Sequence, residues 1–402
     1  MMASRRITYL GESLEIAYIK QTCQKTQESR NIVFLHGWGS HKELMYQAFA
    51  RSFADYTHYY IDLPGFGASP YGEEPESTLD SGLHTQELRI LDTSDYAHIV
   101  LAFLCELGIR ADIIVGHSFG GKVAVMCAEI DSRAEDSALL GSGVGFSKML
   151  ESQSDNQKVD SRENIPTLTK LQDSSPKAKS HRTRIGEIVL LSSAGIVCKK
   201  PLKVRAKIAC AKIAKLVHIR LPFLRASDAR TLNPTMYNIF KRVVDEDFSP
   251  IFATCTNRVY IFWGRDDKDT PLESGEKIHA LIPDSRLFVL SGDHYFFINQ
   301  AVRIESMYQL QAWHIKVSGR VQGVGYRKFA KVKADKLALC GSTQNLPDGS
   351  VEIFACGDSG SLEQFLQALR LGPSRAQVQE VRSEPCALRQ EWLESSEFRI
   401  LT

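Results

Sequence analysis

The sequence has no marked excess of charge of either sign. Among its 402 residues, 49 are Lys or Arg and 47 are Asp or Glu, which gives a net charge of +2 at pH 7. A protein dedicated to nucleic acid usually carries a basic surplus, so we expect no nucleic-acid partner. The shares of hydrophobic residues (43%) and charged residues (24%) are typical of a folded globular protein. At about 150 residues per domain, the length predicts roughly two to three domains.

Long apolar runs and dense cysteine motifs are also missing. No stretch of about 18 uncharged apolar residues occurs, so we expect no membrane span. The basic residues at the N-terminus are not followed by an apolar run, so we expect no signal peptide. The nine cysteines form no Cys-x-x-Cys pair and are predicted to be reduced, mostly buried thiols. These absences together predict a cytoplasmic location.

What the sequence does contain, over its first 130 residues, is an alternation of short apolar runs and segments at helical spacing. Buried strands that alternate with helices predict an α/β fold with a largely parallel sheet. The runs that end at a glycine or proline turn are 31–35, 59–61 and 112–115. Later runs of the same kind are 187–191, 259–263 and 287–290, and a closing helix is expected over 296–310.

Two segments interrupt this pattern. Residues 131–185 are rich in serine and charge and show no strand or helix period, so we interpret them as a polar, mostly disordered insertion. A tolerated surface insertion is favoured over a regulatory segment. Residues 199–230 place lysines between apolar residues at helical spacing. That pattern is typical of a solvated helix face, or of a helix that binds an anionic membrane or an acidic substrate.

A serine flanked by glycines follows the strand at 112–115. In Gly116-His117-Ser118-Phe119-Gly120, small neighbours permit the strained strand-to-helix turn that exposes a serine hydroxyl. The hydroxyl needs a base, expected late in the chain and after an acid. The pair Asp266-Asp267 and then His294 each follow a predicted strand end, at the same sheet edge as Ser118. His117 is expected to pack and not to react.

Five motifs in this order resemble the α/β-hydrolase superfamily over residues 1–312. They are His36-Gly37-Trp38-Gly39, Asp62–Gly67, Gly116–Gly121, Gly264–Pro271 and Gly292-Asp293-His294. The resemblance implies a doubly wound, mostly parallel sheet with a small cap at about 196–250.

The same resemblance implies the roles of the residues. Ser118 is the nucleophile, His294 the base and Asp267 the acid, and the backbone N–H groups of Trp38 and Phe119 form the oxyanion hole. The substrate is then a carboxylic ester or a related carbonyl compound. Hydrolytic C–C cleavage of a diketone remains open, because the cap sets the substrate.

A second motif lies at residues 319–327, Gly-Arg-Val-Gln-Gly-Val-Gly-Tyr-Arg. Its three glycines let successive N–H groups converge on an anion, and the start of the following helix adds partial positive charge. Arg327 can hold a phosphate through two N–H groups. No Lys-Ser or Lys-Thr pair follows, so a nucleoside triphosphate is not expected. From 313 to 402 the predicted order is strand, helix, strand, strand, helix, strand, strand, typical of a small α/β sandwich.

Residues 313–402 resemble acylphosphatase, a ferredoxin-like α/β sandwich. The resemblance rests on 319–327, on Gly341-Ser342-Thr343-Gln344-Asn345 and on 372–378. It implies that Arg327 binds the phosphate of an acyl phosphate and that Asn345 orients the attacking water, without metal or cofactor. The loop residues that it assigns to the phosphate are Gln322, Gly323, Val324, Gly325 and Tyr326.

The two motif sets predict a hydrolase of two domains, 1–312 and 313–402, with small-molecule ester and acyl phosphate substrates. Isolated histidines predict no metal site. In one alternative the second domain is a non-catalytic module that binds phosphate or a partner. Ser342 and Thr343, which replace an aromatic and a small apolar residue of the family, favour that alternative. In a second alternative, the fusion of the two domains is not physiological and two adjacent reading frames have been joined. The sequence does not indicate the oligomeric state.

Overall fold

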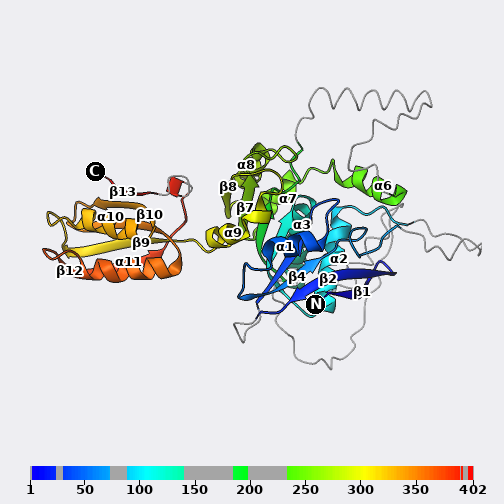
Figure 1. Cartoon of the computed structure of the whole chain (residues 1–402), viewed down its shortest axis with the longest axis horizontal. Helices are drawn as coiled ribbons and strands as arrows, with labels where there is room; N and C mark the ends of the chain where they lie inside the picture. Colours follow the sequence, from blue (N-terminus) through cyan, green and yellow to red (C-terminus); the bar gives the residue numbers. More distant parts are fainter. Residues whose placement is uncertain are drawn as a thin grey trace, which may run out of the picture. The chain divides into compact units, whose positions relative to one another are not determined.

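The computed structural model describes two compact units. Its described residues are 2–23, 30–72, 88–139, 184–197, 233–389, 391–392 and 397–401. The first unit comprises residues 1–285 and 289–298, and the second comprises residues 286–288 and 299–402 (Figure 1). This division assigns the helix α9 (Ala301–Tyr308) to the second unit. The boundary expected at 312 and 313 stays a prediction.

An eight-stranded sheet forms the core of the first unit, in the order β1-β2-β4-β3-β5-β6-β7-β8. The neighbours from β4 to β7 pair in parallel, whereas β2 pairs antiparallel with both β1 and β4. The strands are β1 (Met2–Tyr9), β2 (Glu12–Gln21), β3 (Arg30–Leu35), β4 (Tyr56–Ile61), β5 (Ala111–His117), β6 (Ile185–Leu191), β7 (Val259–Gly264) and β8 (Ser285–Leu290). The mostly parallel sheet that the sequence predicts is confirmed.

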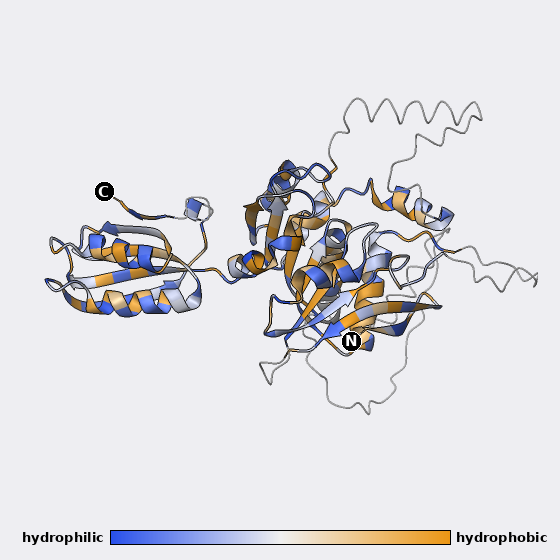
Figure 2. Ribbon diagram, in the orientation of Figure 1, coloured by the Kyte–Doolittle hydropathy of each residue, from blue (hydrophilic) through white to orange (hydrophobic). Residues whose placement is uncertain are grey.

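Helices connect these strands. They are α1 (Lys42–Phe49), α2 (Thr93–Glu106), α3 (Phe119–Leu139), α6 (Pro234–Val243), α7 (Ser249–Thr254) and α8 (Leu272–Leu281). The central strands are buried on both faces. Figure 2 shows that the inner strands of this unit are largely hydrophobic. At the start of α2, Asp92 and Asp95 form a reciprocal capping box that satisfies two end N–H groups.

The hairpin of β1 and β2 was not predicted. Its strands carry charged and polar residues at most outward positions, so no continuous apolar run marks them. Leu10 and Gly11 both have positive φ, 50° and 81°, which suits a tight two-residue turn.

Two sequence predictions about segment boundaries are wrong in part. The helix α3 continues to Leu139, into the expected insertion, because helix-forming residues and the ion pair between Arg133 and Glu129 support it. At its other end, Ile185 already belongs to β6. The helix expected over 296–310 is a 3₁₀ turn (Phe296–Asn299) followed by α9, with a break at Gln300.

Some predicted segments lie outside the described residues. These are the rest of the expected insertion, 140–183, and the basic stretch 199–230 of the expected cap. The described part of the cap region contains α6 and the beginning of α7. Within the described ranges, no helix combines the length and apolar character needed to cross a membrane.

The second unit has a five-stranded sheet in the order β12-β9-β11-β10-β13. Its elements are β9 (Gln311–Arg320), α10 (Tyr326–Lys336), β10 (Cys340–Asn345), β11 (Val351–Gly357), α11 (Ser359–Leu371), β12 (Gln377–Pro385) and β13 (Phe398–Ile400). This order of strands and helices confirms the predicted α/β sandwich. One buried core contains residues of both helices and of the sheet, among them Tyr326, Ala330, Leu362, Phe365 and Ile353.

That core yields a stability prediction. Phe365 of α11 is fully buried, whereas Leu371 at the end of the same helix is 82% exposed. We expect Phe365→Ala to lower the free energy of unfolding of the second unit by about 3–5 kcal/mol, because it leaves a cavity. The control Leu371→Ala should change it by less than about 0.5 kcal/mol. Hydrogen exchange of peptides from this unit in increasing urea measures both, and equal losses would contradict the described packing.

Candidate active sites

Ser118 occupies a strained turn between β5 and α3. Its φ is +51°, a left-handed conformation that is uncommon for residues other than glycine. A Cβ added at Gly116 would lie 2.3 Å from the carbonyl oxygen of Gly120, and one added at Gly120 would lie 2.6 Å from that of His36. Only glycine therefore fits on either side, and the turn presents the serine at the start of α3.

The backbone N–H groups of Trp38 and Phe119 belong to the segments that adjoin Ser118. Within the described part of the chain, the N–H groups of Trp38 and Phe119 donate to no other group. The Trp38 indole packs against the rings of Phe66 (4.9 Å between centroids), Phe119 (5.4 Å) and Phe240 (5.3 Å). Two open donors next to the serine, inside an aromatic surrounding, are suited to an oxyanion.

The structure brings Asp267 and His294 together. The ring Nδ1 of His294 donates to a carboxylate oxygen of Asp267 at 2.8 Å, which leaves Nε2 as the basic nitrogen. Burial alone would raise the pKa of Asp267. Hydrogen bonds from His294 and from the Thr270 backbone outweigh burial and lower that pKa to about 2. The carboxylate is therefore ionised at neutral pH. Asp266, the other acid left open by spacing alone, is exposed.

Two further residues hold this pair, and sequence reasoning did not assign them. The hydroxyl of Thr270 donates to Asp267 at 2.9 Å and lies 3.2 Å from Nδ1 of His294. His117 donates from Nε2 to the carbonyl oxygen of His294 at 3.0 Å, and burial lowers the pKa of His117 to about 3, so its ring is neutral. Because His117 adjoins Ser118, it connects the serine turn to the histidine loop. The sequence predicts only that His117 packs, and it contains no signal for the hydrogen bond to His294.

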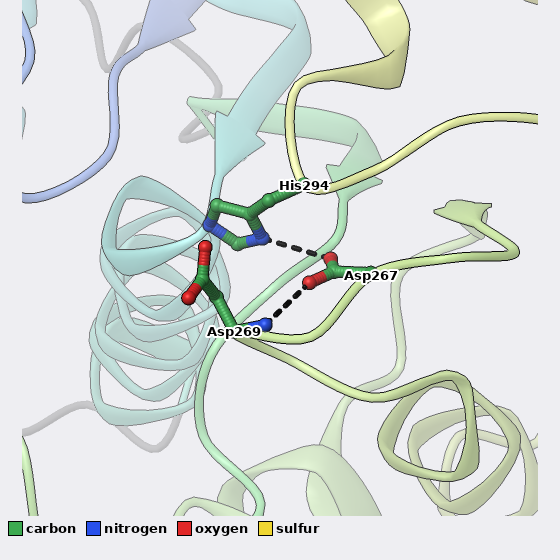
Figure 3. A group of neighbouring side chains, drawn as sticks. All are labelled: Asp267, Asp269 and His294. Atoms are coloured by element: carbon green, nitrogen blue, oxygen red, sulfur yellow. Dashed lines mark hydrogen bonds and ion pairs between the residues drawn. The ribbon is translucent and has the colours of Figure 1, made fainter.

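Asp269 is a third carboxylate at this place. One of its oxygens, an oxygen of Asp267 and a ring nitrogen of His294 lie within 4.8 Å of one another. Figure 3 shows Asp267 bonded to His294 and to the backbone nitrogen of Asp269. These bonds engage both carboxylate oxygens of Asp267 and Nδ1 of His294, whereas the carboxylate of the exposed Asp269 takes no part in them. The group is a hydrogen-bonded acid–base pair with an exposed carboxylate beside it.

In the second unit, the glycine loop adopts backbone conformations that require glycine. Gly319, Gly323 and Gly325 have φ of 118°, 72° and 80°. A Cβ added at Gly323 or Gly325 would meet nothing within 4 Å, so backbone conformation demands these glycines and packing does not. Gly325 is the N-cap of α10, so the loop leads into the positive end of that helix.

Side chains of the loop fasten it to the neighbouring strands. The amide nitrogen of Gln322 donates to the carbonyl oxygens of Leu346 and Ser350, both at 2.8 Å, in the turn that follows Asn345. The buried hydroxyl of Tyr326 donates to the carbonyl oxygen of Leu369. Val324, between the two glycines, packs against the core of this unit. The sequence predicts the phosphate-binding loop but not these hydrogen bonds and packing contacts, because no local sequence pattern marks them.

Arg327 and Asn345, the two predicted reacting residues, lie on adjacent elements. Arg327 is in the first turn of α10 and donates to the carbonyl oxygen of Leu401 at 2.8 Å. Asn345 ends β10, where it is exposed and pairs with Val351. Within the described residues they share no hydrogen bond. Thr343, one of the departures noted above, is buried, and its hydroxyl has no partner among the described groups.

Comparison with known proteins finds a different family in each part of the chain. The profile of the alpha/beta hydrolase family matches residues 32–305, and the profile of acylphosphatase matches residues 313–400. The acylphosphatase of Chlorobaculum tepidum is 45% identical over 89 residues, which are 22% of this chain and 94% of that protein.

Solved structures are similar to each part. An acylphosphatase from Coxiella burnetii covers 24% of this chain and 98% of its own, with 34% identity and a TM-score of 0.23. A meta-cleavage product hydrolase from Pseudomonas fluorescens covers 76% of this chain and 95% of its own, with 16% identity and a TM-score of 0.43. The profile matches and the acylphosphatase relative establish that this chain is a hydrolase that belongs to the alpha/beta hydrolase family through residues 32–305 and to the acylphosphatase family through residues 313–400.

Proposed function

We propose that the chain carries two independent hydrolytic activities. The first unit hydrolyses a carboxylic ester with Ser118 as nucleophile, and the second hydrolyses an acyl phosphate with Arg327 and Asn345. The observation that carries the first activity is the hydrogen bond of 2.8 Å between Asp267 and His294, next to the left-handed turn at Ser118.

In the first unit, His294 removes the hydroxyl proton as the oxygen of Ser118 attacks the acyl carbon. Charge then develops on the carbonyl oxygen, where the N–H groups of Trp38 and Phe119 stabilise it. His294 returns the proton to the leaving alcohol, and a water repeats the sequence to release the acid. Asp267, ionised because its pKa is low, stabilises the imidazolium that forms at His294.

In the second unit, Arg327 and the loop N–H groups bind the phosphate of the acyl phosphate. Asn345 holds a water that attacks phosphorus, so the bond from phosphorus to the acyl oxygen breaks and a carboxylate leaves. The loop N–H groups and the start of α10 supply positive potential where negative charge collects. The glycines at 323 and 325 leave open space above the backbone, which suits close approach of a phosphate.

The two activities should be separable by substitution. We expect Ser118→Ala to reduce hydrolysis of an aryl ester at least about 10³-fold, because the nucleophile is lost. The same variant should leave hydrolysis of benzoyl phosphate unchanged. Arg327→Ala should do the reverse. Both assays are run on the same preparation of each full-chain variant. The activity that a variant keeps shows that the corresponding unit is folded in that preparation.

Three outcomes would redirect the assignment. If either activity survives its own substitution, the residue is not the one proposed. Binding of inorganic phosphate without turnover of benzoyl phosphate would identify the second unit as a phosphate-binding module, the alternative that the residue types of Ser342 and Thr343 favour. Turnover of a diketone that depends on Ser118, with no turnover of esters of varied acyl length, would assign C–C cleavage to the first unit.

The lowered pKa of Asp267 leads to a prediction for the pH dependence of unfolding and to one for the rate of ester hydrolysis. Its folded-state pKa, about 2, lies below the value of about 3.9 in an unfolded chain. The ionised carboxylate therefore stabilises the fold above about pH 4, and this contribution, about 2 kcal/mol, is lost as pH falls from about 4 towards 2. We expect Asp267→Asn to flatten the pH dependence of unfolding between about pH 4 and 2, and to lower ester turnover about 10⁴-fold.

The exposed neighbour Asp266 offers the matched control. Asp266→Asn changes the same charge on the same loop but removes no bond to His294. It should keep the ester activity and the acid-side slope of the stability curve. If Asp266→Asn and Asp267→Asn behave alike in both measurements, the acid of the site has been misassigned.

A further inference from the structure

Two cysteines of the second unit face each other across an antiparallel strand pair. Cys340 of β10 is the register partner of Cys356 of β11. Side chains of register partners project to the same side of a sheet, and their Cα atoms lie about 4.5–5.5 Å apart. A disulfide needs about 4.4–6.8 Å between Cα atoms, so this pairing places the two residues within the range of such a bond.

The two thiols already interact. The thiol of Cys340 donates to the carbonyl oxygen of Cys356 at 3.6 Å. The neighbouring thiol of Cys356 lowers the pKa of Cys340, whereas the thiol of Cys340 and burial raise the pKa of Cys356. Cys340 is also the more exposed of the two. It is therefore the thiol that ionises first and meets a reagent first.

The surroundings of the pair point to thiol chemistry and not to a metal. The cysteines lie in a small apolar cluster with Ala312 and Trp392, and a third thiol, Cys386, packs against it. Within the described part of the chain, no third His, Cys, Asp or Glu completes a metal-binding group with these two thiols. The cluster serves neither of the proposed reactions.

We propose that Cys340 and Cys356 form a reversible disulfide by exchange with a small-molecule disulfide such as oxidised glutathione. The thiolate of Cys340 attacks one sulfur of the reagent, whose S–S bond breaks and releases one glutathione thiolate. The Cys356 thiol then loses its proton and attacks the Cys340 sulfur, which releases the second glutathione. Two cysteine thiols are oxidised, one disulfide is reduced, and the two protons pass to the two glutathione molecules.

The Cys340–Cys356 disulfide would link β10 and β11 at the end of the hairpin opposite its turn. Asn345 lies at the turn end, so the bond restrains the hairpin without touching the residue proposed to hold water. A cross-link between two strands restricts the unfolded chain and so raises the stability of the unit that contains them. This inference does not depend on the proposed activities.

Peptide mapping of the full chain after incubation with oxidised glutathione tests the proposal. We expect a peptide pair linked through Cys340 and Cys356 that dithiothreitol separates, and a thermal transition of the second unit raised by at least about 5 °C. Cys340→Ser and Cys356→Ser should each abolish both effects. Cys386→Ser, which removes the third thiol of the same cluster, should keep both.

The exposed thiol of Cys105, in the first unit, reports that the reagent is active. If Cys105 becomes glutathionylated while Cys340 and Cys356 stay reduced, the proposal is wrong. It is equally wrong if glutathione stays attached to Cys340, or if the cross-link runs through Cys386. Circular dichroism of each serine variant before oxidation separates loss of the bond from loss of the fold.

Discussion

The left-handed backbone of Ser118 is the constraint on which the first site depends. Such a conformation costs about 1–3 kcal/mol and persists only where its surroundings leave no alternative. Here β5 ends and α3 begins without a connecting loop, and two glycines allow the backbone of the turn to lie against β3 and α3. The turn also brings the ring of His117 within hydrogen-bond distance of the His294 carbonyl oxygen, so one backbone distortion helps to position both Ser118 and His294.

Both units place a glycine-rich turn between a strand and a helix at the proposed site. In the first, the turn exposes a side chain, and its glycines are needed for close packing around Gly116 and Gly120. In the second, the turn exposes backbone N–H groups, and Gly323 and Gly325 are needed for their positive φ while nothing packs against them. A covalent mechanism needs the first arrangement and anion binding needs the second, which is consistent with the two proposed reactions.

The sequence predicts the two sheets and the site motifs because buried strands and glycine turns leave strong local signals. It misses the β1–β2 hairpin, whose alternation is masked by charged residues, and the last turns of α3, which an ion pair supports. It also misses the contacts of His117, Thr270 and Gln322. Each of these joins segments far apart in the chain, so no local pattern contains it.

The replacements at Ser342 and Thr343 bear on Asn345 less than their types suggest. Among the described residues the buried hydroxyl of Thr343 finds no partner, a cost of about 1–3 kcal/mol to the unit. Yet β10 is bonded on one side to β11 and on the other to β13, so the strand is held by its backbone. Gln322 in turn binds the carbonyl groups of the turn that begins directly after Asn345. The position of Asn345 is therefore set by main-chain pairing, which substitutions in neighbouring side chains leave in place.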